Sequence, residues 1–504
     1  TISGHFWEDL FQQRIAQPLG MTSTTFQPNG PALNPDIAAG AYSTTDDYLR
    51  FVQVLAAGGV WEGKRILSRR GVDQMLADQT RGTRIASSYY AADEAIRPGA
   101  GGNRYGFGNW LEGAADGVSE ANSSQGAFGV SPYIDRRRDF AFLVFQRNSG
   151  SGFNRFYYEI QDALTNAFPL PEAPLTAKFE ERAVVVSSVP NPAGEPEGVD
   201  GIRTAHRYVP TACRQPTSQC PALIAVHANA SNGLAFAAES GLAGLAERER
   251  AVVEVWDGSR AGLAVPGEEN PRSWDITPDF GTLPGNDAAL VAWAAKQLAA
   301  TPGVDPGRVY LLGFREGADV AALAACREPD SFAGLVLVQP SIQLKDRGDD
   351  ELQHRVCDGV GRLPVMLWSS APAETGAEAP EPDAATLQAA FWAGRQRCAA
   401  HAGMEWPRGT APWKVTDWSG CQFGAQVRLL TLPNAIDAWP ADGLPVSWEF
   451  LRGFDNGFRA KGAVVQTNAA SYVRRHTSAG ALAALFGSGM ASGTWFAEGQ
   501  GLPT

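Results

Sequence analysis

The sequence predicts a multidomain α/β protein whose largest part carries a mostly parallel β-sheet. The chain has 504 residues, of which 44% are hydrophobic and 19% charged, enough for two or three domains with their own cores. In the region 201–458, short continuous apolar runs alternate with helical stretches, which is typical of a parallel sheet buried on both faces. The expected strands are residues 223–226, 251–255, 309–312, 334–338 and 365–368, and the expected covering helices are residues 287–298 and 318–325.

The first region, residues 1–168, mixes helices with strands. Two of its stretches repeat apolar residues at helical spacing, and Ser43 to Asp46 supply an N-cap cluster before the second. Two later apolar runs, separated by a charged turn, predict a hairpin. We therefore expect an α+β domain here. The expected helices are residues 6–19 and 46–57, and the expected strands are residues 126–133 and 139–145.

Changes in composition mark the expected domain boundaries. Two groups of prolines predict a linker and entry strand over residues 169–200, before the α/β region 201–458. After residue 458 the sequence becomes rich in small residues, so residues 459–504 are expected to begin a separate module. The chain opens on Thr1 within an amphipathic run and the given residues hold no leader, so we expect a cut N-terminus. Residues 459–504 are too few to close a module, so we expect the chain to be cut at the other end as well.

The charge balance argues against two classes of partner. The 54 acidic and 42 basic residues give a net charge of −12, the wrong sign for binding a phosphate backbone. No run of about 18 apolar residues is present to span a bilayer. We therefore expect neither a nucleic-acid partner nor a membrane span.

Cysteine usage favours an oxidising compartment. The six cysteines show no C-x-x-C spacing, and the histidines show no metal-ligand spacing, so no metal and no cofactor are expected. The even count favours three disulfides and a secreted or periplasmic protein, with buried thiols of a cytosolic protein as the alternative. The cysteines are Cys213, Cys220, Cys326, Cys357, Cys398 and Cys421.

Several stretches of the first region resemble the C-terminal part of the serine β-lactamase, penicillin-binding-protein and class C esterase family. They are Pro18-Leu19-Gly20-Met21, Thr24-Thr25-Phe26, residues 40–48, Tyr105-Gly106-Phe107-Gly108 and Ser124-Gln125-Gly126-Ala127-Phe128-Gly129. The resemblance implies acyl transfer by a Ser-x-x-Lys serine assisted by a Tyr-x-Asn loop. Neither motif occurs in this chain, so we expect both to lie upstream of Thr1.

Ser124 and Gly126 replace the family's Lys-Thr-Gly triplet on the strand that lines the cleft. That strand could offer an oxyanion donor or be an ordinary edge strand.

The region 178–458 resembles α/β-hydrolases of the secreted polyhydroxybutyrate-depolymerase and feruloyl-esterase type. The stretches that carry the resemblance are Tyr208-Val209-Pro210, His227-Ala228-Asn229-Ala230, and residues 238–242, 304–310, 325–332, 418–421 and 438–440. The family's cysteine positions imply the pairs Cys213–Cys220, Cys326–Cys357 and Cys398–Cys421.

The chain departs from this family at each catalytic position. The G-x-S-x-G elbow reads Gly313-Phe314-Arg315-Glu316-Gly317, which puts Arg315 in the place of the nucleophile. Asp437 stands where the resemblance places the histidine, and no carboxylate follows 365–368 where the acid is expected. The triad is therefore expected to be lost. Arg315 and Asp437 are predicted to form a salt bridge, with an Arg315 that points to solvent beside Glu316 as the alternative.

The sequence leaves three functional hypotheses open. The chain is expected to be a fragment of a secreted hydrolase that acts on esters or amides, with an inactive α/β-hydrolase domain. Alternatively, the dead pocket binds a carboxylate or an ester-polymer-derived ligand through Arg315, His227 and Asn229. His227 itself is expected to be structural rather than catalytic. A structural spacer is the third hypothesis.

The tail, residues 459–504, resembles the start of an Ig-like module of secreted acidobacterial proteins.

Overall fold

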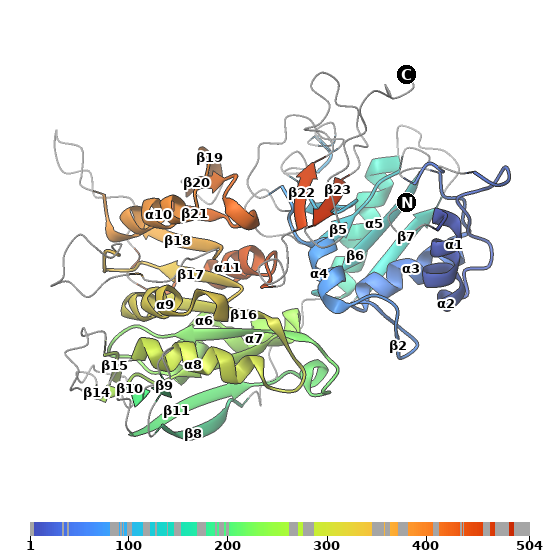
Figure 1. Ribbon diagram of the computed structural model, residues 1–504. Coiled ribbons are helices and arrows are strands. Elements are labelled where there is room, and N and C mark those ends of the chain that lie inside the picture. Colours follow the sequence, from blue (N-terminus) through green and yellow to red (C-terminus); the bar gives the residue numbers. More distant parts are fainter. Residues whose placement is uncertain are drawn as a thin grey trace. The chain divides into compact units, whose positions relative to one another are not determined.

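A computed structural model gives the fold of the chain (Figure 1). Two compact units form, residues 1–48 with 457–504, and residues 49–456. The boundaries expected at residues 168, 200 and 458 stay predictions. The structure describes residues 5–32, 35–37, 40–80, 90, 93, 95–97, 103–113, 121–126, 129–138, 140–145, 153–168, 178–186, 189–190, 196–197, 201–261, 271–275, 287–344, 357, 363–370, 382–406, 413–433, 436, 438–456, 464–468 and 483–487.

The first unit begins with the helical run predicted over 6–19. It comprises α1 (Trp7–Phe11), the π-helical η1 (Gln12–Ala16) and α2 (Gln17–Leu19). Gly20 ends the run in the left-handed conformation at φ 65°, which glycine adopts without strain. Near the other end of the chain, β22 (Val464–Asn468) and β23 (Ala483–Gly487) pair as an antiparallel hairpin. The Ig-like assignment of this tail stays a prediction.

An antiparallel sheet forms the centre of the β-lactamase-like region within the second unit. The expected hairpin is present as β6 and β7, with Val130 opposite Phe145. Its first strand starts at Val130 instead of residue 126 because the Gly126 N–H donates to the Val130 carbonyl and closes a turn there. In sheet order the strands are β3 (Arg104–Tyr105), β4 (Trp110–Glu112), β5 (Ala121–Ser123), β6 (Val130–Asp135) and β7 (Phe140–Phe145).

Helices accompany this sheet. The predicted helix over 46–57 is α3 (Thr45–Ala56), and α5 (Phe153–Ala167) packs Tyr157 and Tyr158 against the sheet residue Tyr133. A further helix, α4 (Arg69–Leu76), was not predicted; the Ser68 hydroxyl caps it by accepting the Gly71 N–H at 3.0 Å. A small hairpin, β1 (Val60–Trp61) with β2 (Lys64–Arg65), precedes it.

The rest of the second unit is built on a ten-stranded sheet in the order β19-β20-β21-β18-β17-β16-β12-β13-β11-β8. Strands β13, β12, β16, β17, β18 and β21 run parallel, which confirms the mostly parallel sheet, while both edges are antiparallel. The strands are β8 (Glu180–Val186), β11 (Gly201–Tyr208), β12 (Cys220–Val226), β13 (Val252–Trp256), β16 (Val304–Phe314), β17 (Gly334–Val338), β18 (Val365–Ser370), β19 (Ala400–Trp406), β20 (Trp413–Ser419) and β21 (Val427–Leu432).

Helices cover both faces of the parallel strands, as Figure 1 shows. Because side chains alternate along a strand, Leu311 faces one core and Leu312 the other. The first core is closed by α8 (Asp287–Ala299), α9 (Glu316–Arg327) and α10 (Ala384–Arg395), and the second by α6 (Gly233–Ser240), α7 (Leu242–Glu249) and α11 (Gly443–Leu451). The remaining short elements are β9 (Val189–Pro190), β10 (Pro196–Glu197), β14 (Arg260–Ala261), β15 (Arg272–Ser273), η5 (Thr211–Cys213), η6 (Pro329–Ser331) and η7 (Gln422–Gly424).

Three disulfides cross-link the α/β region. Cys213–Cys220, Cys326–Cys357 and Cys398–Cys421 are all formed, which confirms the pairing that the family resemblance implied. These pairs use all six cysteines of the chain, so the alternative of buried thiols is wrong.

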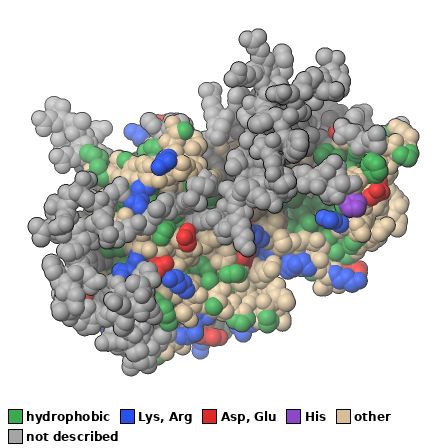
Figure 2. Space-filling model, viewed as in Figure 1, with side chains coloured by type: hydrophobic (Ala, Val, Ile, Leu, Met, Phe, Trp, Pro, Cys, Tyr) green, Lys and Arg blue, Asp and Glu red, His purple; other side chains and the backbone are tan. Residues whose placement is uncertain are grey.

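The described surface carries charges of both signs. Figure 2 shows basic and acidic side chains interspersed over the visible described part of one face. The absence of a nucleic-acid partner stays a prediction. Among the described residues, no helix combines the length and apolar character that crossing a bilayer requires.

Candidate functional site

The turn between β16 and α9 has the backbone geometry of a nucleophile elbow. Its apex residue, Arg315, has φ 51° and ψ −120°, a strained conformation for a residue with a side chain. The Arg315 N–H donates to the Val338 carbonyl at 2.8 Å, which ties the apex to the end of β17. The chain therefore forms the sharp strand–turn–helix of an elbow with arginine at its apex, and the assignment of this apex to the nucleophile position stays a prediction.

The two flanking glycines make this turn possible. A Cβ atom on Gly313 would overlap the Gly317 carbonyl, and one on Gly317 would overlap the carbonyls of Val226 and His227. Helix α9 thus approaches the end of β12 more closely than any residue with a side chain permits. The G-x-R-x-G pattern keeps the steric requirements of the elbow although the central serine is absent.

The Arg315 side chain reaches toward the loop after β21. Its Nη2 donates to the Ile436 carbonyl at 3.1 Å, and its Nε lies 3.4 Å from the Gln339 Oε1. This loop is where the resemblance places the triad histidine. Asp437, the predicted ionic partner, lies outside the described residues, so the salt bridge stays a prediction. The alternative of an arginine that points only to solvent does not fit these two contacts.

His227 is a fully buried residue at the end of β12. Its Nε2 accepts the Gly258 N–H at 3.1 Å, and its Nδ1 lies 2.6 Å from the Ala228 carbonyl, so the proton belongs on Nδ1. Trp274 packs on the ring and donates its Nε1–H to the His227 carbonyl at 2.7 Å. Burial lowers the pKa of His227 to about 4, which keeps the imidazole neutral. These contacts suit a residue that shapes the loop.

Asn229 continues this loop, which supplies an oxyanion donor in α/β-hydrolases. The Asn229 backbone N–H donates to the Glu316 Oε2 at 3.1 Å, and the Asn229 Oδ1 accepts the backbone N–H of Trp274 at 3.1 Å. Glu316 directly follows the apex arginine, so a carboxylate from the elbow accepts an N–H of the segment where the resemblance places the oxyanion loop. Sequence reasoning missed this role. An acidic residue directly after the nucleophile position was the available signal.

Strand β18 ends where the triad acid would follow. The Ser369 hydroxyl donates to the Asp383 Oδ2 at 2.5 Å, and the Asp383 Oδ1 accepts the Thr386 N–H at 2.9 Å as the N-cap of α10. Asp383 is therefore used to start a helix. Residues 371–381 lie outside the described residues, and the loss of the acid stays a prediction.

The β-lactamase-like region places Ser124 and Gly126 between β5 and β6. The Ser124 N–H donates to the Pro132 carbonyl at 3.3 Å, and the Gly126 N–H to the Val130 carbonyl at 2.7 Å. Both N–H groups thus bond to β6. The cleft-lining role of these two residues stays a prediction.

Across the described residues, no three His, Cys, Asp or Glu side chains gather closely enough to hold a metal ion.

Comparisons with known proteins place two families along the chain. Residues 1–166 match the family model described as beta-lactamase, and residues 207–343 match that described as esterase PHB depolymerase. Over 240 residues the chain is 26% identical to NocK of Nocardia uniformis subsp. tsuyamanensis, provisionally named an esterase; the match covers 45% of this chain and 67% of NocK. These matches confirm both resemblances and their order.

Solved structures give weaker likenesses. A Bacteroides dorei protein, provisionally titled a beta-lactamase, is 30% identical with a TM-score of 0.26, over 32% of this chain and 52% of its own. The present chain thus spans about half the length of that protein. An acetyl xylan esterase from Aspergillus awamori is 15% identical with a TM-score of 0.35, over 51% of this chain and 93% of its own. The two family matches are what identify a β-lactamase-related segment followed by an esterase-related segment.

Proposed function

We propose that the esterase-related segment is a catalytically inactive α/β-hydrolase, carried by a piece of a secreted or periplasmic serine hydrolase. The observation that carries this proposal is Arg315 at the apex of the elbow. A guanidinium stays protonated at working pH and offers no lone pair to a carbonyl carbon. Loss of the triad serine alone lowers turnover by about 10⁶-fold in a measured protease.

The surroundings of the elbow support the same conclusion. An oxyanion hole stabilises negative charge with backbone N–H groups that are free to donate. In this chain the Glu316 carboxylate accepts the Asn229 N–H and brings a negative charge to that position. An incoming oxyanion would compete with this hydrogen bond and be repelled by the carboxylate.

The parent protein is proposed to hydrolyse an ester or amide through its β-lactamase-related part. That chemistry needs an acyl-enzyme on a Ser-x-x-Lys serine. None of the lysines in residues 1–504 has a serine three positions earlier, so we expect the chain as given to be inactive. The three disulfides favour an oxidising compartment.

A fluorophosphonate probe followed by mass spectrometry of the labelled peptides tests this proposal. We expect no labelled serine in the chain under conditions in which a known active esterase is labelled fully. A serine that reacts at the rate of the control esterase would overturn the proposal and identify the nucleophile directly.

Ligand binding at the dead elbow is the second candidate function. It is favoured by the half-buried guanidinium of Arg315 at the N-terminal end of α9, because a guanidinium donates paired hydrogen bonds to a carboxylate. The proposed ligand is a carboxylate, such as an acid released from an ester polymer. Thermal unfolding with and without hydroxybutyrate tests it. A stabilisation lost in Arg315→Ala supports binding at the elbow, and an equal shift in both proteins contradicts it.

A further inference from the structure

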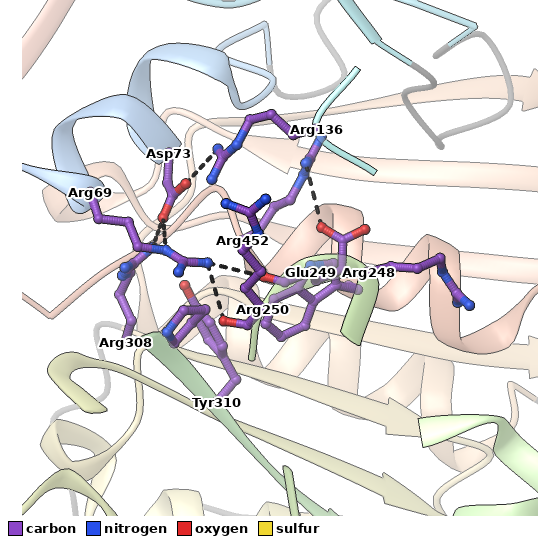
Figure 3. A pocket seen from close by; sticks show the side chains of 11 residues that line it. Arg69, Asp73, Arg136, Arg248, Glu249, Arg250, Arg308, Tyr310 and Arg452 are labelled. Atoms are coloured by element: carbon purple, nitrogen blue, oxygen red, sulfur yellow. Dashed lines mark hydrogen bonds and ion pairs between the residues drawn. The ribbon is translucent and has the colours of Figure 1, made fainter. Parts of the chain in front are cut away.

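A small cavity within residues 49–456 is lined mainly by arginines. Helix α4 supplies Arg69 and the β6–β7 turn supplies Arg136, while the end of α7, strand β16 and the end of α11 supply the others. The cavity has a volume of about 30 Å³. Figure 3 shows side chains from these separate elements converging on it, with Asp73 among them. The six lining arginines are Arg69, Arg136, Arg248, Arg250, Arg308 and Arg452.

Positive charge exceeds negative charge around this cavity. Two carboxylates of the described residues line it, Asp73 and Glu249. Two further carboxylates do not line the cavity but pair with arginines that do: Asp305 with Arg308 at 2.9 Å, and Glu449 with Arg452 at 2.8 Å. Leaving Arg250 aside, the five other lining arginines share these four carboxylates, and one of the four, Glu249, also pairs with Arg137 at 3.5 Å. An uncompensated buried charge is costly, so the arrangement favours an additional anion.

Asp73 is already saturated by its neighbours. Its carboxylate pairs with Arg136 at 2.5 Å, with Arg308, and more distantly with Arg69 at 3.6 Å. Burial alone would raise the pKa of Asp73, but the guanidinium groups of Arg136 and Arg308 hold it well below its usual range. One carboxylate therefore serves three arginines and cannot neutralise them all.

Arg69 has only a long contact with its carboxylate, since its Nε lies 3.6 Å from the Asp73 Oδ2. Its side chain is only 8% exposed, and within the described residues its Nε–H forms no hydrogen bond. Its Nη2 donates to the backbone carbonyls of Glu249 and Arg250 at 3.2 and 3.1 Å, which fixes the guanidinium in place. The pKa of Arg69 is lowered to about 9, first by burial; Asp73 opposes this shift, while Arg136 and Arg308 act in the same direction as burial.

We propose that this cavity binds a small inorganic oxyanion, of the phosphate or sulfate class, beside Arg69, Arg136 and Arg452. Planar guanidinium groups donate paired hydrogen bonds to such oxyanions. The small volume favours a compact inorganic anion. The bound anion would link α4 and the β6–β7 turn to α11. The proposal stands apart from the inactivity of the elbow.

Thermal unfolding and isothermal titration calorimetry with inorganic phosphate and with sulfate test the site. Sodium chloride of equal ionic strength is the control for screening. We expect phosphate or sulfate to raise the unfolding temperature of the wild-type chain beyond the effect of chloride, because a ligand that binds only the folded state stabilises it.

Two variants locate the binding. Arg136→Gln removes a cation from the turn and is expected to weaken anion affinity by about 10-fold or more, the loss of one charge-assisted hydrogen bond. Arg97→Gln is the matched control, because Arg97 pairs with Asp162 at 2.6 Å on an exposed surface away from the cavity lining. No specific binding to the wild-type chain, or equal binding by both variants, would overturn the proposal.

Discussion

The carboxylate of Glu316 accepts the backbone N–H of Asn229 at 3.1 Å, across the junction between the elbow and the end of β12. These residues are 87 positions apart in the sequence, and the parallel pairing of β12 with β16 brings them together. In an active hydrolase both positions contribute backbone N–H groups to an oxyanion. In this chain the carboxylate of Glu316 itself accepts the N–H of Asn229.

Arg315→Ser is expected to leave the chain inactive. Restoring the hydroxyl does not restore a general base, because Asp437 stands at the expected position of the histidine, and Glu316 still bonds to the Asn229 N–H. The measurement is fluorophosphonate labelling at the new serine. Labelling at the rate of an active esterase would show that a base and an oxyanion hole survive.

The hydrogen bond between Glu316 and Asn229 is expected to contribute modestly to stability. Glu316→Ala should lower the free energy of unfolding by only about 1 kcal/mol, because the hydrogen bond to the charged carboxylate is exposed to solvent. Glu316→Gln keeps an acceptor and should lose less. Urea unfolding of both variants checks the order, and equal losses would contradict this expectation by showing that an uncharged acceptor does not replace the carboxylate.

Gly317→Ala should destabilise the fold by about 3 kcal/mol or more, since the new methyl group overlaps the carbonyls of Val226 and His227. The matched control is Gly394→Ala in α10, where an added Cβ meets no atom within 4 Å. That change should stabilise by about 0.5–1 kcal/mol through helix propensity. Chemical denaturation of both variants measures the contrast, and similar effects would contradict the close approach at the elbow.

His227 should make the protein less stable in acid. The pKa of His227 is lowered from 6.5 to about 4, and burial is the main cause. The nearby Arg272 acts in the same direction, whereas the carboxylates of Asp257 and Glu316 act against the shift. As the pH falls from 6.5 toward 4, the unfolded chain takes up a proton that the folded chain does not. The stability contributed above pH 6.5 is therefore lost across this window, on the order of 3 kcal/mol.

The measurement is the free energy of unfolding as a function of pH for the wild-type chain and for His227→Gln. The difference between the two curves should narrow as the pH falls, because the variant has no imidazole to protonate. Parallel curves, or a His227 resonance that titrates near its ordinary pKa, would show that the imidazole is not buried as described.

The disulfides should differ in their contributions. Cys326–Cys357 spans 31 residues and Cys213–Cys220 spans 7. Because a longer closed loop restricts the unfolded chain more, removing them should cost about 4 and about 2 kcal/mol respectively. Paired Cys→Ala variants compared by urea denaturation test this order. A reversed order would show that contacts in the folded state outweigh the loop entropy.

Much of the fold could be predicted from local patterns. Continuous apolar runs such as 334–338 indicated strands buried on both faces, and β17 is buried throughout. The edges could not be predicted in this way: β20 alternates buried residues with more exposed ones, and it runs antiparallel because it pairs with β21, while β19 in turn pairs with β20. Helix α4 was missed because it is short and rich in polar residues.

By itself the sequence determined the fold class, the order of the two family segments, the disulfide partners implied by resemblance and the arginine at the elbow. Each of these depends on residue identity and spacing along the chain. Tertiary structure decided which distant groups share one space: Glu316 with Asn229, and Arg69 with Arg136 and Arg308 around Asp73. Charge and hydrogen-bond partners at these places come from strand order and helix packing, which bring together residues that no local spacing connects.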